Sequence, residues 1–205
     1  RRWIFHLIPR PGEVGHDTWP PEAYKTATGV MPWSGQALDE ARGIVYVATK
    51  TAEPDFWGAD RHGQNLFANS LVALDAATGR VLQEVKFGAT VVGAPARLGD
   101  VLAVRTKDGW LRGVSAADPS AEKWKVFIGA AAHLETIVAT DGAFFLCRRD
   151  RNDVLPSWVV SPAGEALRRL YLRFTFPPEN WRGTLLVDDL FGRRQAFCLP
   201  AGGDD

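Results

Sequence analysis

Short runs of alternating hydrophobic and polar residues dominate the chain, and runs with a helical period are scarce. A period of two is typical of β-strands that turn one face toward a core. Turns containing Asp-Gly or Thr-Gly separate the runs, and such turns join antiparallel strands. The pattern therefore predicts an all-β meander. The clearest runs are residues 43–50 (GIVYVATK), 69–79 (NSLVALDAATG), 100–109 (DVLAVRTKDG), 136–147 (TIVATDGAFFLC) and 183–200 (GTLLVDDLFGRRQAFCLP).

The runs repeat with a period of about 40 residues, which is typical of propeller blades. Residues 69–87 and 110–127 align as third strand, turn and fourth strand of a blade, and residues 1–5 (RRWIF) match a fourth strand whose own blade is missing. We predict a partial or small β-propeller of about four four-stranded blades. The alternative is a meander whose Asp-Gly turns make its segments loosely similar. Unpaired blade edges would invite self-association or a partner chain.

One turn element supports the repeat over the loose meander. In Ala-Leu-Asp-x-x-Thr-Gly, Asp75 and Thr78 can hydrogen-bond the turn backbone while Gly79 takes a positive φ.

Residues 51–68 interrupt the strand pattern with a loop that is too long for a turn. Phe56 and Trp57 can give the loop a small core of its own, and Asp60 can pair with Arg61. A self-packed loop without ligand contact is favoured over direct substrate contact by any one of these residues. Long ordered loops are nevertheless often functional.

Composition excludes several partner classes. Lys plus Arg equals Asp plus Glu, at 24 each, so no global field recruits nucleic acid. No apolar run is long enough for a membrane span. Cys147 and Cys198 are too few for a disulfide framework, and the sequence leaves their pairing open. The basic run 147–153 (CRRDRND) contains acids and predicts a solvated hairpin tip.

The histidines do not predict a metal site. His6, His16, His62 and His133 do not cluster at metal-ligand spacing. His16 is expected to be a neutral hydrogen-bonding residue in a loop.

Residues 3–24 (WIFHLIPRPGEVGHDTWPPEAY) and 32–79 (PWSGQALDEARGIVYVATK and onward to DAATG) carry a family resemblance. They resemble the pyrroloquinoline quinone (PQQ) dependent dehydrogenases, in the membrane-type glucose dehydrogenase branch. The likeness is dense over residues 2–80. It implies one propeller domain or propeller fragment over residues 1–205, with dehydrogenase-like blades in 1–88 and divergent PQQ-like blades in 89–205.

Two residues match cofactor-binding positions of this family. Trp33 matches the Trp whose indole lies beneath the quinone ring, and stacking suits a flat tricyclic cofactor. Lys107 matches the Lys that faces the quinone oxygens, where an ammonium stabilises the charge of the reduced form. The alternatives are a core Trp and an ordinary turn Lys.

The family's catalytic stretch, His-His-Asp-x-Trp-Asp, has no counterpart. The corresponding residues 78–100 (TGRVLQEVKFGATVVGAPARLGD) contain no acid in the position of the general base, so we predict no catalytic residue. Asp100 is expected to lie in a plain hairpin turn. Gln83 replaces a packing Trp that Trp3 and Trp124 supply in the other copies. Ligands for Ca²⁺ or Mg²⁺ are not found, although the family uses such an ion.

Two functional hypotheses remain. The first is a fragment or divergent member of a PQQ-dependent dehydrogenase that oxidises a sugar or alcohol and lacks the catalytic base. The second is a non-catalytic PQQ-like repeat protein that acts as a scaffold or protein-binding module. The resemblance implies a periplasmic or extracytoplasmic location.

Overall fold

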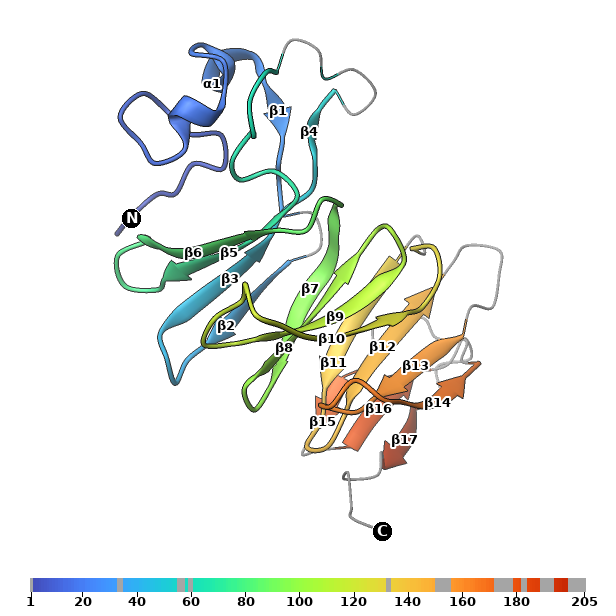
Figure 1. Ribbon diagram of the computed structural model, residues 1–205. Coiled ribbons are helices and arrows are strands. Elements are labelled where there is room, and N and C mark those ends of the chain that lie inside the picture. The colour runs from blue at the N-terminus through green and yellow to red at the C-terminus, as the bar shows by residue number, and fades with distance from the viewer. Residues whose placement is uncertain are drawn as a thin grey trace. The chain divides into compact units, whose positions relative to one another are not determined.

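The structure is a computed structural model, and it describes residues 2–32, 35–54, 58, 61–131, 134–149, 156–171, 179–181, 184–188 and 194–198. The chain forms two compact units, residues 1–92 (unit 1) and 93–205 (unit 2). Nearly all regular structure is β (Figure 1).

Unit 1 contains one four-stranded antiparallel sheet in the order β2-β3-β5-β6. Adjacent strands of the chain are adjacent in the sheet, which is the meander expected of a propeller blade. The strands are β2 (Gln36–Asp39), β3 (Ile44–Ala48), β5 (Ser70–Asp75) and β6 (Val81–Lys86). The two central strands are mostly buried, and β6 is mostly half-buried.

A small module adjoins this sheet. Between β3 and β5 the chain leaves the sheet, and β4 within this excursion pairs with β1 from the segment before β2. Figure 1 shows β1, β4 and the helix α1 together beyond one end of the sheet. The module contains the 3-10 helix η1 (His16–Thr18), α1 (Ala23–Thr26), β1 (Thr28–Gly29) and β4 (Ala52–Glu53).

Unit 2 contains three further antiparallel sheets, in the orders β7-β8-β9-β10, β11-β12-β13-β14 and β15-β16-β17. The first is β7 (Val91–Leu98), β8 (Val101–Thr106), β9 (Trp110–Ser115) and β10 (Glu122–Phe127). The second is β11 (Leu134–Ala139), β12 (Phe144–Arg149), β13 (Ser157–Val160) and β14 (Ala166–Leu170). The third is β15 (Glu179–Trp181), β16 (Thr184–Asp188) and β17 (Arg194–Cys198).

Strand β12 shows how the sheets of unit 2 share their cores. Phe144 and Leu146 lie in a cluster with residues of β8 and β9, whereas Phe145 and Cys147 lie in another with β16. Successive side chains of a strand point to opposite faces, so β12 is buried on both. All four side chains are at most 2% exposed. The middle sheet is therefore packed between two others.

A Trp–Gly contact recurs in the two units. The Trp3 indole Nε1 donates to the carbonyl of Ala76, 3.1 Å away, and a Cβ on Gly79 would lie 2.5 Å from Trp3 Cε3. In unit 2 the Trp124 Nε1 donates to the carbonyl of Pro162 at 2.8 Å, and a Cβ on Gly164 would lie 2.5 Å from Trp124 Cγ. In each case an indole covers the turn between a third and a fourth strand.

The fold prediction is confirmed: the chain is all-β, and its described residues form four blade-like meanders, three with four strands and one with three. Each of the five alternating runs contains a strand. The Asp75 turn also forms as expected, because Asp75 Oδ1 accepts from the Thr78 N–H at 2.7 Å and the Thr78 hydroxyl at 2.8 Å. Gly79 has φ +73°.

The prediction of a strand in residues 1–5 is wrong. Residues 2–6 belong to no strand, because no neighbouring strand supplies the ladder of hydrogen bonds. Trp3 nevertheless makes the same kind of contact within unit 1 that Trp124 of the fourth strand β10 makes within unit 2.

The contact of Trp3 with Gly79 yields a test. Gly79→Ala is expected to lower the free energy of unfolding of unit 1 by about 1–3 kcal/mol more than Gly88→Ala, because the new methyl collides with the indole. Gly88 is a matched control, since its φ is +72° and a Cβ there would meet nothing within 4 Å. Urea unfolding measures the difference, and equal losses would contradict the contact.

Candidate functional site

The described part of the inserted loop packs against the N-terminal segment. Trp19, Ala23 and Val30 form a buried cluster with Ala52 and Ala68, which lie near the two ends of the loop. Trp19 is 4% exposed and Val30 is fully buried. Burying a large apolar side chain contributes roughly 1.5–3 kcal/mol, so this cluster fixes the loop on the segment before β2.

Hydrogen bonds tie the end of the loop to the residues before α1. The Thr18 hydroxyl accepts from the Leu66 N–H at 2.9 Å, and the Thr18 carbonyl accepts from the Asn65 N–H at 3.0 Å. The Trp19 indole N–H donates to the Leu66 carbonyl. These partners are nearly 50 positions apart in the sequence, so the loop and the N-terminal segment form one structure.

The described residues leave the expected core of the loop and the Asp60–Arg61 pair untested. The core that holds the ends of the loop is shared with the N-terminal segment. Phe56, Trp57 and Asp60 lie outside the described residues, so their predicted roles stay predictions. Arg61 is described, and its guanidinium donates to the carbonyls of Pro54 and Ala52, both at 3.2 Å.

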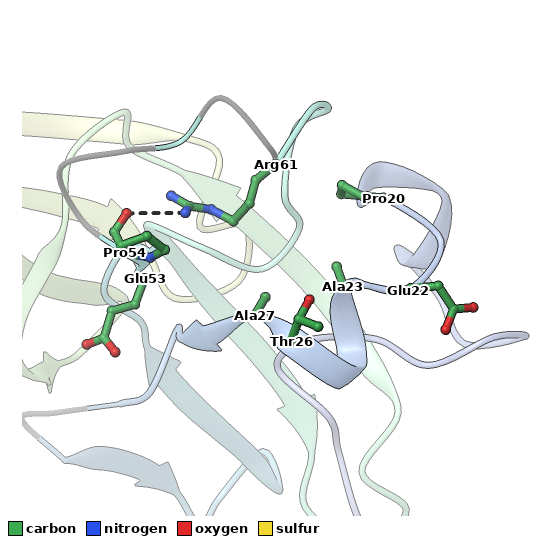
Figure 2. Close-up of a pocket in the computed structure, with 8 residues that line it drawn as sticks. All are labelled: Pro20, Glu22, Ala23, Thr26, Ala27, Glu53, Pro54 and Arg61. Atoms are coloured by element: carbon green, nitrogen blue, oxygen red, sulfur yellow. Dashed lines mark hydrogen bonds between the residues drawn. The ribbon is translucent and has the colours of Figure 1, made fainter.

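A pocket of about 250 Å³ opens between α1 and the loop (Figure 2). Figure 2 shows the Arg61 side chain extending toward Pro54 on one side, with the residues of α1 facing it across the space. The wall is largely apolar. It is lined by Pro20, Glu22, Ala23, Thr26, Ala27, Glu53, Pro54 and Arg61.

The acids of this pocket are already engaged. Lys50 pairs with Glu53 and lowers the pKa of that carboxyl, and the Thr28 hydroxyl, 3.2 Å away, adds to the effect. Glu22 pairs with Lys25 at the surface. The pocket therefore presents mainly apolar surface and one guanidinium, and it does not resemble an acid–base pair arranged for catalysis.

The structure describes one of the two predicted cofactor residues. Trp33 lies outside the described residues, so its stacking role stays a prediction. Lys107 lies in the turn between β8 and β9 and is exposed. The neighbouring Asp108 is held by other groups: burial alone would raise its pKa, but the Thr106 hydroxyl and Arg112 lower it. The ammonium of Lys107 is therefore reachable by an anion.

The segment that replaces the family's catalytic stretch is ordinary sheet. Residues 78–100 contain all of β6 and β7, and Asp100 lies in the β7–β8 turn. Asp100 Oδ2 is 3.0 Å from the Lys123 Nζ and 3.3 Å from the Ser115 hydroxyl. These contacts give Asp100 a structural role, as predicted. Gln83 occupies the third position of β6, and Trp124 occupies the third position of β10.

Sequence reasoning missed a buried cluster of charges in unit 2. Glu135 on β11 accepts from Arg105 Nε of β8 at 2.7 Å and from Arg148 Nε of β12 at 2.8 Å. The side chains of Arg105, Arg148 and Glu135 are 0%, 4% and 2% exposed. Burial lowers the pKa of Arg105, and the Glu135 carboxylate opposes this shift.

The remaining guanidinium N–H groups of this cluster bind the connection between two sheets. Arg105 donates to the Gly129 carbonyl at 2.6 Å, and Arg148 donates to the Ile128 carbonyl at 3.3 Å. The prediction that residues 147–153 form a solvated tip is wrong for Arg148, because Glu135 lies opposite it inside the unit. Residues 150–153 lie outside the described part. The only sign of this charge cluster in the sequence is Glu135, which lies among the apolar residues of a strand.

The histidines of the described part serve local contacts. His16 Nε2 lies 3.1 Å from the Pro21 carbonyl, the hydrogen bond expected of it, and His6 Nδ1 lies 2.8 Å from Glu13. His133 is not among the described residues. Among those that are, no three His, Cys, Asp or Glu side chains gather as a metal site would require. No described helix has the length and hydropathy of a membrane span.

Comparison with known proteins finds a family similarity in the first part of the chain. Residues 1–86 match the PQQ family described as "Glucose/ethanol/alcohol dehydrogenase, beta-propeller domain". The match includes the N-terminal segment, the inserted loop and the sheet of unit 1. It supports the PQQ-type β-propeller fold, and it ends six residues after the dense resemblance, which ends at residue 80.

Individual relatives are partial matches. Over 51 residues the chain is 41% identical to quinoprotein glucose dehydrogenase A of Acinetobacter calcoaceticus, a stretch that is 24% of this chain and 6% of that protein. The match thus spans a small part of that relative, and it does not confirm the glucose dehydrogenase branch. Among solved structures, the computationally designed Ika4 protein is similar with a TM-score of 0.52 and 12% identity, over 95% of this chain and 98% of that chain.

The computationally designed Ika8 protein gives the same TM-score, 0.52, at 14% identity. That match covers 79% of this chain and 44% of the Ika8 chain. At such low identity the two designed proteins show the fold alone.

The Thr18 contacts predict a local effect of mutation. Thr18→Val keeps the side-chain shape but removes the acceptor of the Leu66 N–H, so the end of the loop should open at least about tenfold more often. Amide hydrogen exchange at Leu66 measures this opening. Thr26→Val on the exposed face of α1 is the control and should leave the exchange unchanged. Unaltered Leu66 protection in Thr18→Val would contradict the role of Thr18.

The buried charges predict a large loss of stability. Glu135→Gln leaves two buried guanidinium groups without their carboxylate and should lower the free energy of unfolding of unit 2 by about 3–5 kcal/mol. Glu122→Gln is the control, because Glu122 pairs with Arg112 at 2.6 Å but its side chain is 35% exposed. An exposed pair contributes under about 1 kcal/mol. Similar losses in both variants, measured by denaturant unfolding, would overturn this assignment.

Proposed function

We propose that this chain is a divergent member or a part of a PQQ-dependent sugar or alcohol dehydrogenase, and that it retains affinity for PQQ. The observation that carries the proposal is the family match over residues 1–86, which includes the inserted loop and the segment that holds it. The packing of Trp19 and the hydrogen bonds of Thr18 show that the ends of this loop are held against the N-terminal segment.

In this proposal Trp33 stacks beneath the cofactor. A flat indole buries one face of a tricyclic ring system and leaves the polar edge of the ring to other partners. Trp33 precedes the first residue of β2 by three positions in the sequence.

Lys107 is the second residue predicted to bind PQQ, to which it would supply a positive charge. PQQ is an anionic quinone that accepts two electrons from an alcohol carbon. An ammonium near its oxygens favours binding of the anion and stabilises the negative charge of the reduced form. The exposure of Lys107, next to an Asp108 that Arg112 and Thr106 hold, is consistent with this role.

The proposal does not give the chain a complete active site. Oxidation of an alcohol needs a base within hydrogen-bond reach of the substrate hydroxyl. The acid nearest to the expected position, Asp100, is bound to Lys123 and Ser115. We therefore expect cofactor binding without turnover by the 205-residue chain, and a periplasmic location like that of other proteins of this type.

A non-catalytic scaffold is the second candidate. It is favoured by residues 78–100, which form plain strands in place of the catalytic stretch, and by the largely apolar described interior of unit 2. A protein that binds no PQQ and retains these blades would serve assembly or protein contacts.

The two candidates differ in an equilibrium titration with PQQ, followed by cofactor absorbance with and without Ca²⁺. We expect saturable binding that weakens at least about tenfold in Trp33→Ala and more modestly in Lys107→Ala, because stacking and charge are separate contributions. Lys125→Ala, another exposed lysine in unit 2, is the control and should bind like the unaltered chain.

Absence of saturable binding would contradict the dehydrogenase proposal and favour the scaffold. Binding that is unchanged in Trp33→Ala and Lys107→Ala would show that PQQ uses other residues. Sugar-dependent dye reduction by the purified chain would show that the missing base is supplied by a residue not considered above.

A further inference from the structure

A buried arginine holds the turn that carries Lys107. Strand β8 ends at Thr106 and β9 begins at Trp110, so residues 107–109 form the turn between them. Arg105 Nη1 donates to the Thr106 carbonyl at 2.7 Å and to the Trp110 carbonyl at 3.1 Å. These two carbonyls flank the turn. A single guanidinium nitrogen therefore joins the end of one strand to the start of the next.

The other residues of the turn are held by their own contacts. The Gly109 N–H donates to the carbonyl of the last residue of β8 at 3.2 Å. A Cβ on Gly109 would lie 2.5 Å from Phe127 Cε2, so the Phe127 ring packs against the turn. Asp108 pairs with Arg112 at 3.4 Å. The Lys107 side chain is exposed, so this fixed turn presents an ammonium to solvent.

The guanidinium of Arg105 is itself fixed from the next sheet. Its Nε donates to Glu135 at 2.7 Å, and its Nη2 donates to the Gly129 carbonyl at 2.6 Å. A planar guanidinium with partners on all three nitrogens has no freedom to rotate. A buried ion pair is weak evidence for stability, and fixing one conformation is a role attested for such pairs in other proteins. Here the conformation that is fixed is that of the turn.

We propose that Arg105 is a positioning residue for Lys107, which it holds ready for an anionic quinone. The inference rests on the proposed function, in which Lys107 binds PQQ. A lysine side chain has several rotatable bonds, and a mobile turn would add to the freedom that binding must remove. A turn that is already fixed lowers this cost. The affinity that Lys107 contributes then depends on Arg105.

Arg148 offers a matched control inside the same charge cluster. Its Nε donates to Glu135 at 2.8 Å, and its other nitrogens donate to the carbonyls of Ile128 and Ala130 in the connection between two sheets. Arg105→Gln and Arg148→Gln each leave Glu135 with one buried arginine, so both variants should fold. Arg105→Gln is expected to loosen the β8–β9 turn, and Arg148→Gln is expected to leave it intact.

The first measurement needs no cofactor. Amide hydrogen exchange at Gly109 reports how often the turn opens, and we expect opening at least about tenfold more often in Arg105→Gln than in Arg148→Gln. Arg105→Lys restores the charge without the fork of donors and should resemble Arg105→Gln. It also replaces Arg105→Gln if that variant does not fold. Equal exchange in the Arg105 and Arg148 variants would overturn the proposal.

The second measurement asks whether Arg105 acts through Lys107. PQQ affinity is measured by titration for Arg105→Gln, for Lys107→Ala and for the chain with both changes. Arg105→Gln should weaken binding at least about threefold, but no more than Lys107→Ala does, and should have no further effect once Lys107→Ala is present. A residue that only stabilised the fold would weaken binding equally in both backgrounds. Arg148→Gln should bind like the unaltered chain.

The outcomes separate this inference from the proposed function. If the unaltered chain binds no PQQ, or if Lys107→Ala has no effect, the role of Lys107 fails and this inference fails with it. If Lys107→Ala weakens binding while Arg105→Gln does not, or if the two losses are additive, this inference alone is overturned. PQQ binding through Lys107 would then stand without a positioning role for Arg105.

Discussion

The structure depends on the burial of sheets on both faces. In β12 every side chain from Phe144 to Cys147 is buried, although neighbours along a strand point in opposite directions. A single four-stranded sheet cannot bury both faces of such a strand, so other sheets must pack against it. Each sheet of unit 2 therefore takes its stability from the sheets packed against it, and stability is shared between neighbours as in other repeat proteins. The Trp124 contact with Gly164 adds a specific link to this general one.

The strands and the repeat were predictable because they rest on local patterns. Alternating apolar residues identify β5, β8 and β12, and the Asp75 turn carries its own hydrogen-bonding groups. The prediction failed for residues 1–5 since a strand is defined by a partner, and no local pattern shows whether the partner is present. Arg148 was misjudged for the same reason: the acid that permits its burial, Glu135, lies 13 positions away on another strand.

The candidate site was predictable only in part. The loop at 51–68 was identified by its length, but the residues that hold it, Thr18 and Trp19, come from a segment almost 50 positions earlier. Spacing cannot reveal such pairs, whereas a family resemblance over both segments implies that they belong together. The absence of the catalytic acid was visible in the sequence, and the structure adds that Asp100, its nearest substitute, stabilises a turn.

The charge cluster around Glu135 has a consequence for how chains of this type can evolve. Genes for repeat proteins often change by exchange of whole repeats, and such exchange succeeds when a boundary cuts few interactions. Here one sheet supplies Arg105, the next supplies Glu135 and Arg148, and the connection at 128–130 is held by both arginines. A recombination boundary between these two sheets would separate Arg105 from Glu135, its buried anionic partner. The pair of sheets from β7 to β14 is therefore expected to be inherited as one piece.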